Sequence, residues 1–213
     1  MTEVVASYHD RVRTDILPLA PERAGRVLDL GGGIGATGAR LKALGRAEVV
    51  VLADQVADTV AHGVDRAYAG DLEDLGLIRR IVDESGPFDT ILCLDILEHL
   101  RDPWGVLREL REGLAPGGCV VVSLPNLGHL SVVAPLVLRG RFDLVEAGIR
   151  DRTHLRWFTL PSILDLIAGA GLAVEAVQKT IPRRLHKAAD ILSARLLNRF
   201  FVTQYVVRAR RPD

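Results

Sequence analysis

The stretch that most constrains this chain is an apolar run that meets a carboxylate and then turns through closely spaced glycines. Residues 26–30 are mostly apolar and include Asp29, and Gly31, Gly33 and Gly35 follow before a helical pattern begins. This order predicts a buried strand, a tight turn and a helix N-terminus. Because glycine lacks a Cβ, a ligand can approach the backbone closely. The unpaired N–H groups of the helix start then favour a nucleotide-like ligand at the carboxyl edge of a sheet.

Two alignments of this stretch compete. In the first, residues 33–38 fit G-x-G-x-x-G, the dinucleotide-binding fingerprint, but the strand then delivers Asp29 where an apolar residue is expected. In the second, Asp29, Gly31, Gly33 and Gly35 fit apolar-apolar-Asp-apolar-Gly-x-Gly-x-Gly, which resembles the first motif of the class I S-adenosylmethionine-dependent methyltransferases. That cofactor carries an ammonium and a sulfonium, which would account for a buried carboxylate. The alternative is a carboxylate that caps local backbone N–H groups.

Further candidate cofactor residues follow the next predicted strands. The second strand ends at Asp54, whose carboxylate can accept hydrogen bonds from both ribose hydroxyls of a nucleoside, or can cap a following helix. After the third strand, the resemblance implies that Asp71 accepts from the adenine amino group and that Leu72 offers its backbone N–H. A cap for a helix expected over residues 73–85 is the alternative for Asp71. Leu94, which ends the fourth predicted strand, completes the expected cofactor residues.

The second half of the resemblance lies between the fourth and fifth predicted strands. A strand over residues 88–94 is followed by Leu-Glu-His-Leu at 97–100, by Asp-Pro at 102–103, and by Leu-Ala-Pro-Gly-Gly at 114–118. This combination is characteristic of class I methyltransferases, and with it the resemblance covers residues 27–126. It implies an α/β, Rossmann-like fold with a seven-stranded, mostly parallel sheet. The last strand is expected to be antiparallel, with helices on both faces.

His99 is the candidate catalytic residue. It follows the fourth strand at the carboxyl edge, where open α/β sheets place their chemistry, and imidazole titrates near neutral pH. Methyl transfer to a hydroxyl needs a base to remove the proton. The alternative is a histidine that packs under a lid and binds a backbone carbonyl. His129 and His154 are further candidates for the base.

The spacing of Asp95, Glu98 and His99 permits a second hypothesis. It is similar to the acidic-x-x-Glu-His segment of the ubiquinone-pathway O-methyltransferases, which use a divalent cation. The resemblance therefore makes Mg²⁺ or Mn²⁺ a candidate cofactor beside S-adenosylmethionine. The alternative is that these residues begin a helix and that Glu98 is solvated.

The remaining segments are interpreted as parts of one domain, because 213 residues suit one domain better than two. Residues 1–25 are expected to hold an amphipathic helix over residues 4–19. Residues 127–158 form a long insertion, expected to be a lid over the acceptor. A basic helix is expected over residues 183–200; its charged side is a candidate surface for an anionic substrate or a membrane, or a solvated face.

Composition limits the partners. Lys plus Arg and Asp plus Glu number 27 each, so the net charge gives no general attraction to nucleic acid. Neither a signal peptide nor an apolar run of about 18 residues is found, so no membrane span and a cytoplasmic location are expected. Cys93 and Cys119 are expected to be buried and reduced.

The sequence therefore predicts a methyltransferase that acts on a hydroxyl, less readily an amine, of a small molecule such as a sugar, a quinol or a natural product. Two alternatives remain open at this point. One is a non-catalytic protein that binds S-adenosylmethionine as a sensor or assembly subunit. The other is an NAD(P)-dependent oxidoreductase, against which the position of Asp29 and the segment 95–118 argue.

Overall fold

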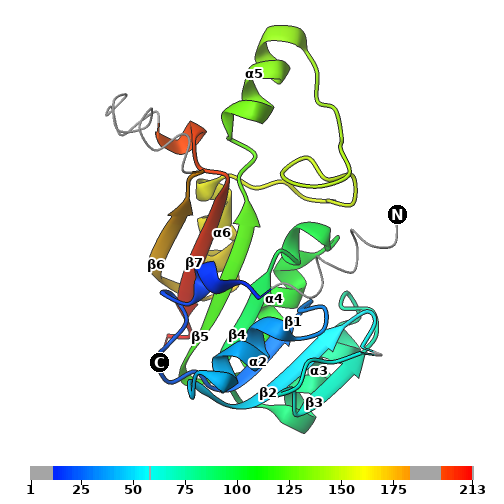
Figure 1. Ribbon diagram of the computed structural model, residues 1–213, viewed down its shortest axis with the longest axis vertical. Coiled ribbons are helices and arrows are strands. Elements are labelled where there is room, and N and C mark those ends of the chain that lie inside the picture. The colour runs from blue at the N-terminus through cyan, green and yellow to red at the C-terminus, as the bar shows by residue number, and fades with distance from the viewer. Residues whose placement is uncertain (1–11, 58, 183–197, 213) are drawn as a thin grey trace.

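The computed structural model describes residues 12–57, 59–182 and 198–212. Their sheet has seven strands in the order β3-β2-β1-β4-β5-β7-β6 (Figure 1). Strands β1 to β5 pair in parallel, and β7 runs antiparallel to both β5 and β6. The expected mostly parallel sheet with an antiparallel last strand is thereby confirmed. The strands are β1 (Gly25–Leu30), β2 (Ala47–Asp54), β3 (Arg66–Ala69), β4 (Phe88–Leu94), β5 (Leu114–Pro125), β6 (Ala173–Thr180) and β7 (Gln204–Arg210).

Helices cover both faces of the sheet, as expected. Alternate residues of a strand point to opposite faces, so Leu28 of β1 packs with α3 (Leu75–Ser85), α4 (Pro103–Glu112) and α6 (Leu160–Gly169), whereas Val27 packs toward α2 (Ala36–Ala43). The central strands are therefore buried on both sides, which explains their almost uninterrupted apolar sequences. The two free cysteines, Cys93 and Cys119, are buried in these strands.

The termini of the chain agree only in part with the expectation. The helix predicted over residues 4–19 is not continuous: Arg13 has non-helical backbone angles, and only the short 3₁₀ helix η1 (Thr14–Ile16) follows it. Residues 1–11 lie outside the described part. So do residues 183–197 of the expected basic helix, whose last three positions form a 3₁₀ turn, η3 (Asn198–Phe200).

The loop after β2 also differs from the expectation. No helix follows Asp54 in the described residues 55–57 and 59–65, so a helix-capping role for Asp54 is wrong. Likewise the next helix, α3, begins at Leu75 and is capped by Asp74, whose side chain accepts from the Gly76 N–H at 2.8 Å. Asp71 is therefore not the helix cap.

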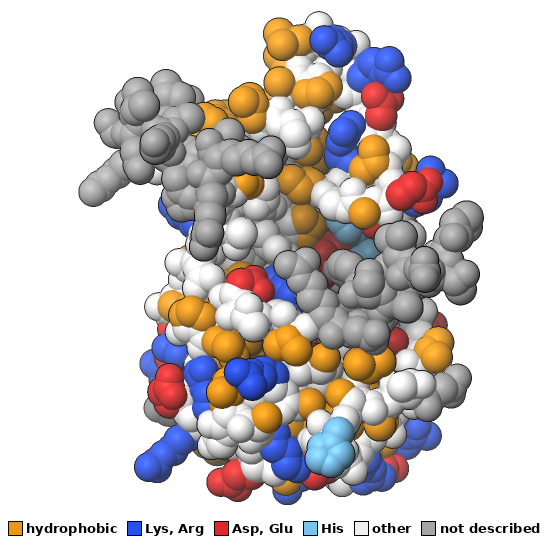
Figure 2. All heavy atoms as spheres, in the orientation of Figure 1, with side chains coloured by type: hydrophobic (Ala, Val, Ile, Leu, Met, Phe, Trp, Pro, Cys, Tyr) orange, Lys and Arg blue, Asp and Glu red, His pale blue; other side chains and the backbone are white. Residues whose placement is uncertain are grey.

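The insertion at residues 127–158 forms an arm that leaves and rejoins the sheet at one place. At its base Asn126 bridges to Phe158, and the Leu127 N–H donates to the Phe158 carbonyl at 2.8 Å. The arm carries α5 (Leu130–Arg139) at its outer end, above the carboxyl ends of the strands (Figure 1). Hydrophobic and basic side chains mix over its outer surface (Figure 2). No helix of the described residues has both the length and the hydropathy needed to cross a bilayer.

Candidate cofactor and active site

Asp29 is a fully buried carboxylate that supports the start of α2. Its Oδ2 accepts a hydrogen bond from the Gly38 N–H at 3.1 Å. The N-cap of α2 is Gly35, which has no side chain to cap the first turn, so Asp29 supplies the acceptor and the negative charge that a helix N-terminus favours. Burial raises the pKa of Asp29 to about 6. The capping alternative is thus observed; a role toward a cofactor stays a prediction.

The glycines after β1 adopt the left-handed backbone that the tight turn requires. Gly31, Gly33 and Gly35 have φ of +68°, +62° and +80°. A Cβ at Gly31 would lie 2.5 Å from the Ile96 side chain, and one at Gly35 would lie 2.7 Å from Val64. The loop therefore needs glycine both for its conformation and for its close packing against the segment after β4 and the segment before β3.

Asp54 ends β2 directly beside this loop. Its Oδ2 accepts from the Gly33 N–H at 2.8 Å, and its Oδ1 lies 3.3 Å from the Val56 nitrogen that donates to it. The parallel register of β1 and β2 brings the two strand ends together. The structure thus joins two of the residues that the sequence assigned to the cofactor, although their role in binding it is a prediction.

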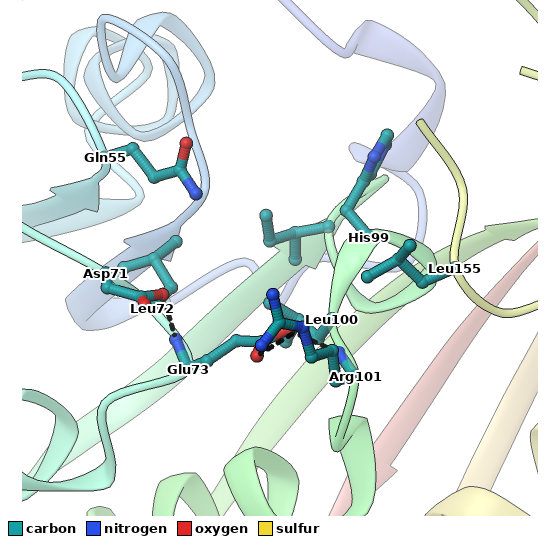
Figure 3. Close-up of a pocket in the computed structure, with 9 residues that line it drawn as sticks. Gln55, Asp71, Leu72, Glu73, His99, Leu100, Arg101 and Leu155 are labelled. Carbon is teal, nitrogen blue, oxygen red and sulfur yellow. Dashed lines mark hydrogen bonds and ion pairs between the residues drawn. The ribbon is translucent and has the colours of Figure 1, made fainter. Parts of the chain in front are cut away.

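A cavity of about 260 Å³ opens at the same edge of the sheet. Asp71 and Leu72 line one side and His99 and Leu155 the other (Figure 3). Asp71 accepts from the Glu73 N–H at 2.9 Å, which orients its carboxylate (Figure 3). The complete lining is Gln55, Asp71, Leu72, Glu73, Ile96, His99, Leu100, Arg101 and Leu155. The predicted adenine contacts and the predicted base therefore share one cavity.

Leu94 does not line this cavity. It is half-buried at the end of β4 and packs against the core on the α2 side of the sheet. Its position therefore gives no support to the predicted contact with a cofactor, and that contact stays a prediction.

Asp95, the next residue, belongs to a different network. It has a left-handed backbone, with φ of +57°, and forms an ion pair with Arg13. The Ser123 hydroxyl donates to its Oδ1 at 3.2 Å, and the Gln204 amide donates to the same oxygen. Burial raises the pKa of Asp95, and the Arg13 guanidinium opposes that rise.

Glu98 and His99 lie in the 3₁₀ turn η2 (Leu97–His99), where the arm returns to the sheet. Glu98 is 1% exposed, so the expectation that it is solvated is wrong. Burial and then the charge of Asp95 raise the pKa of Glu98 well above its ordinary value. The His99 and His154 rings meet edge-on, with centroids 4.8 Å apart. Histidine and acidic side chains are visible where the arm meets the body of the molecule (Figure 2).

The metal site expected from Asp95, Glu98 and His99 is not formed. Ligand-type atoms of Glu98, His99 and His154, rather than Asp95, lie within 4.8 Å of one another, while Asp95 is held by Arg13. The predicted donor set of Asp95, Glu98 and His99 is therefore not brought together in this structure.

The two further histidines have other contacts. His129 caps α5 by accepting from the Ser131 N–H at 3.2 Å, and its own backbone N–H donates to the Asn126 carbonyl at the base of the arm. The Nδ1 of His154 lies 3.3 Å from the Ile149 carbonyl, and burial lowers the pKa of His154. Neither lines the cavity.

Sequence reasoning missed several residues that shape this edge. Arg13 has no motif around it, and Ser123 and Gln204 lie in ordinary strand sequence. Asp151 and Thr153 belong to the polar run of the insertion, whose density was the only available signal. Tertiary contacts alone bring them to Asp95 and His99.

Comparison with known proteins identifies the family. A family model described as a methyltransferase domain matches residues 5–177. The ubiquinone biosynthesis O-methyltransferase of Ralstonia nicotianae is 32% identical over 202 residues, which cover 91% of this chain and 79% of that protein. The protein of the same description from Xanthomonas oryzae pv. oryzae is 30% identical over 156 residues, 72% of this chain. The match spans only 64% of that Xanthomonas protein.

The fold is shared with solved structures. A SAM-dependent methyltransferase from Archaeoglobus fulgidus superposes with a TM-score of 0.66 at 15% identity, over 99% of this chain and 95% of that one. At such identity the likeness shows the fold alone. The family match, the sequence relatives and the sheet order agree with one another. The chain belongs to the class I S-adenosylmethionine-dependent methyltransferases.

Proposed function

We propose that this protein transfers a methyl group from S-adenosylmethionine to a hydroxyl of a small molecule. The observation that carries the proposal is the shared cavity: Asp71 and Leu72 line one side, and His99 lines the other. The residues proposed to bind the nucleoside and the proposed base therefore lie close enough to contact a cofactor and an acceptor bound together. Proximity of this kind is the main requirement for in-line methyl transfer.

The residues at this edge fit the cofactor by their chemistry. Asp54 and Asp71 offer carboxylate oxygens for ribose hydroxyls and an amino group, and Leu72 adds an apolar surface for a ring. The glycine loop brings the backbone close to whatever binds there. When bound, S-adenosylmethionine supplies an electrophilic methyl group; the chain holds and orients it.

His99 is proposed as the base for the acceptor. Its imidazole takes the hydroxyl proton as the oxygen becomes methylated, and later releases that proton to water. Leu155 and Ile96, which line the same cavity, limit the access of water. The contact foreseen for a structural histidine is also present, because Nδ1 of His99 lies 3.3 Å from the Thr153 carbonyl; the other ring nitrogen is the one proposed to react.

The cavity, the arm and the sequence relatives all favour a small molecule as the methyl acceptor. The cavity of about 260 Å³ lies near the lower limit of ligand pockets, and the arm at residues 127–158 packs against η2 at its wall. The names of these relatives describe O-methylation, which supports a hydroxyl as the group that receives the methyl.

The experiment is a turnover assay with isotopically labelled methyl groups. Purified protein is given S-adenosylmethionine and panels of phenolic, quinol, sugar and amine acceptors, with and without a chelator. Label on a hydroxyl oxygen, unaffected by chelation, is the expected result. Label confined to amines would overturn the hydroxyl assignment. Activity that is lost with the chelator and restored only by Mg²⁺ or Mn²⁺ would support the metal hypothesis instead.

The same assay separates the rival functions. Tight cofactor binding by calorimetry with no turnover across the panels would favour a sensor or assembly protein. Binding of NAD(H) or NADP(H) in preference to S-adenosylmethionine would favour an oxidoreductase.

A further inference from the structure

The returning segment of the arm contacts the ring of His99. Nδ1 of His99 lies 3.2 Å from the Thr153 hydroxyl oxygen and 3.3 Å from the Thr153 carbonyl oxygen. The two residues are 54 positions apart in the chain. This side of the imidazole is therefore held by the arm, and not by η2, the turn that carries it.

The direction of these hydrogen bonds follows from the hydroxyl itself. The Thr153 hydroxyl donates to Oδ1 of Asp151 at 2.7 Å, and a hydroxyl has only one hydrogen to give. A carbonyl oxygen can only accept. Both Thr153 oxygens near the ring are therefore acceptors, so Nδ1 of the neutral imidazole must carry the proton.

Backbone contacts fix Asp151 and Thr153 in place. Oδ1 of Asp151 also accepts from the Thr153 N–H at 2.8 Å, which closes a tight turn. The backbone N–H groups of Leu155 and Arg156 donate to the Glu98 carbonyl at 2.8 and 3.0 Å, which ties the turn to the residue before His99. Hydrogen bonds therefore join the turn both to the imidazole of His99 and to the backbone of Glu98.

We propose that Thr153 and Asp151 are positioning residues for the base. The chain from Asp151 through Thr153 to His99 holds the proton on Nδ1 and leaves the lone pair on Nε2. A base oriented by a second group and a third is the general logic of hydrogen-bonded catalytic chains. Because two of the three members lie on the arm, the base is competent only when the arm is seated on η2. The inference rests on the proposed role of His99 in hydroxyl methylation.

The first test measures the tautomer and needs no acceptor. Long-range ¹H–¹⁵N correlation spectra of the ring, assigned by loss of the signal in His99→Gln, are recorded at a pH where the imidazole is neutral. The proton is expected on Nδ1 in the parent. In Thr153→Val, which removes the hydroxyl acceptor and leaves only the backbone carbonyl, the ring is expected to shift in part toward the Nε2–H form that free imidazole side chains prefer.

Asp151→Ala gives the same shift by a different route, because the freed Thr153 hydroxyl can then donate to Nδ1. Thr153→Ser should retain the parent tautomer. Arg152→Gln is the matched control, since Arg152 lies between the two positions and its side chain pairs with Glu146 instead. Unfolding by denaturant is compared in all variants, so that a loosened turn is recognised.

The second test asks whether the tautomer matters for turnover. With an accepted hydroxyl substrate, kcat of Thr153→Val is expected to fall roughly 10-fold or more while KM for S-adenosylmethionine is unchanged, with rescue by Thr153→Ser. A parent ring protonated on Nε2, or a tautomer unaltered in Thr153→Val, would overturn the inference. So would an altered tautomer with unaltered kcat. Full activity of His99→Gln would instead show that His99 is not the base. Failure of the positioning role and failure of the proposed base are therefore distinguishable.

Discussion

The guanidinium of Arg13 forms an ion pair with the carboxylate of Asp95, across 82 positions of the chain. It also bonds the Ser123 hydroxyl at 2.9 Å, while Gln204 donates to both Ser123 and Asp95. Four segments meet at this ion pair: the residues before β1, the turn after β4, the end of β5 and the start of β7. Asp95 is held with a left-handed backbone, and this turn leads directly into Glu98 and His99. The network therefore anchors the segment that carries the proposed base.

Removal of Arg13 should destabilise the fold, because the largely buried carboxylate of Asp95 then loses the guanidinium that pairs with it. Arg13→Met is expected to cost roughly 2 kcal/mol, less than the loss of a fully buried ion pair because both side chains retain some exposure. Denaturant unfolding measures the change, and Arg23→Met, at an exposed position of the same segment, is the control.

The double variant Arg13→Met with Asp95→Asn tests the pairing itself. The combined cost should be clearly smaller than the sum of the single costs, because the second change removes the unpaired charge. Strict additivity would mean that the two residues act independently.

Asp29→Asn should stabilise the protein at neutral pH. The pKa of Asp29 is raised to about 6 by burial, so ionisation of the folded state is penalised as pH rises from about 3.8 through about 6. The amide keeps an acceptor for Gly38 without the charge, and the gain is expected to reach up to about 3 kcal/mol above pH 6. Below pH 3.8 the variant and the parent should be equally stable.

Asp65→Asn provides a control of opposite sign. Burial alone would raise the pKa of Asp65, but hydrogen bonds from Lys42 and from the Val50 N–H outweigh it and lower the pKa. That variant should be less stable than the parent near pH 7, and the difference should close on acidification. The same sign of effect in both variants would contradict these assignments.

Asp54→Ala should weaken S-adenosylmethionine binding. The change removes the acceptor of the Gly33 N–H and the proposed ribose contacts, each worth about 0.5–1.5 kcal/mol net. Calorimetry should show a loss of roughly 10-fold or more. Glu48→Ala, at the exposed start of the same strand, should bind normally; equal affinity in both variants would remove Asp54 from the cofactor site.

His99→Gln should retain cofactor affinity and lose roughly 10²–10⁴-fold in turnover, the usual contribution of a positioned general base. A protonated imidazole cannot accept a proton, so the parent rate should fall on acidification and the variant should lose this limb. His62→Gln, at an exposed loop position, should behave as the parent. Undiminished turnover in His99→Gln would direct attention to His129 and His154.

The local sequence was sufficient for the architecture around β1. The apolar run at residues 26–30, the spacing of Gly31, Gly33 and Gly35, and the acid at Asp54 predicted a strand, a turn and a neighbouring strand end, because short-range sterics and burial dictate these elements. The family resemblance implied a mostly parallel sheet with an antiparallel last strand, and the antiparallel β7 is confirmed.

The contacts around the proposed base could not be predicted in this way. Glu98, which one hypothesis placed in a metal site and its alternative placed in solvent, is buried. Asp95, a predicted metal ligand, pairs with Arg13 instead. Spacing of three and four along the chain indicates which residues share a turn. It does not indicate which segments cover them.

The sequence by itself determined that this chain forms the sheet of a class I methyltransferase and presents acids and glycines at its carboxyl edge. Only the tertiary structure decided that Arg13 neutralises Asp95 and that Thr153 holds His99. The physical reason is that hydrophobic periodicity and turn chemistry act within a few residues, whereas the partner of a buried charge or an imidazole is chosen by packing among segments distant in the chain.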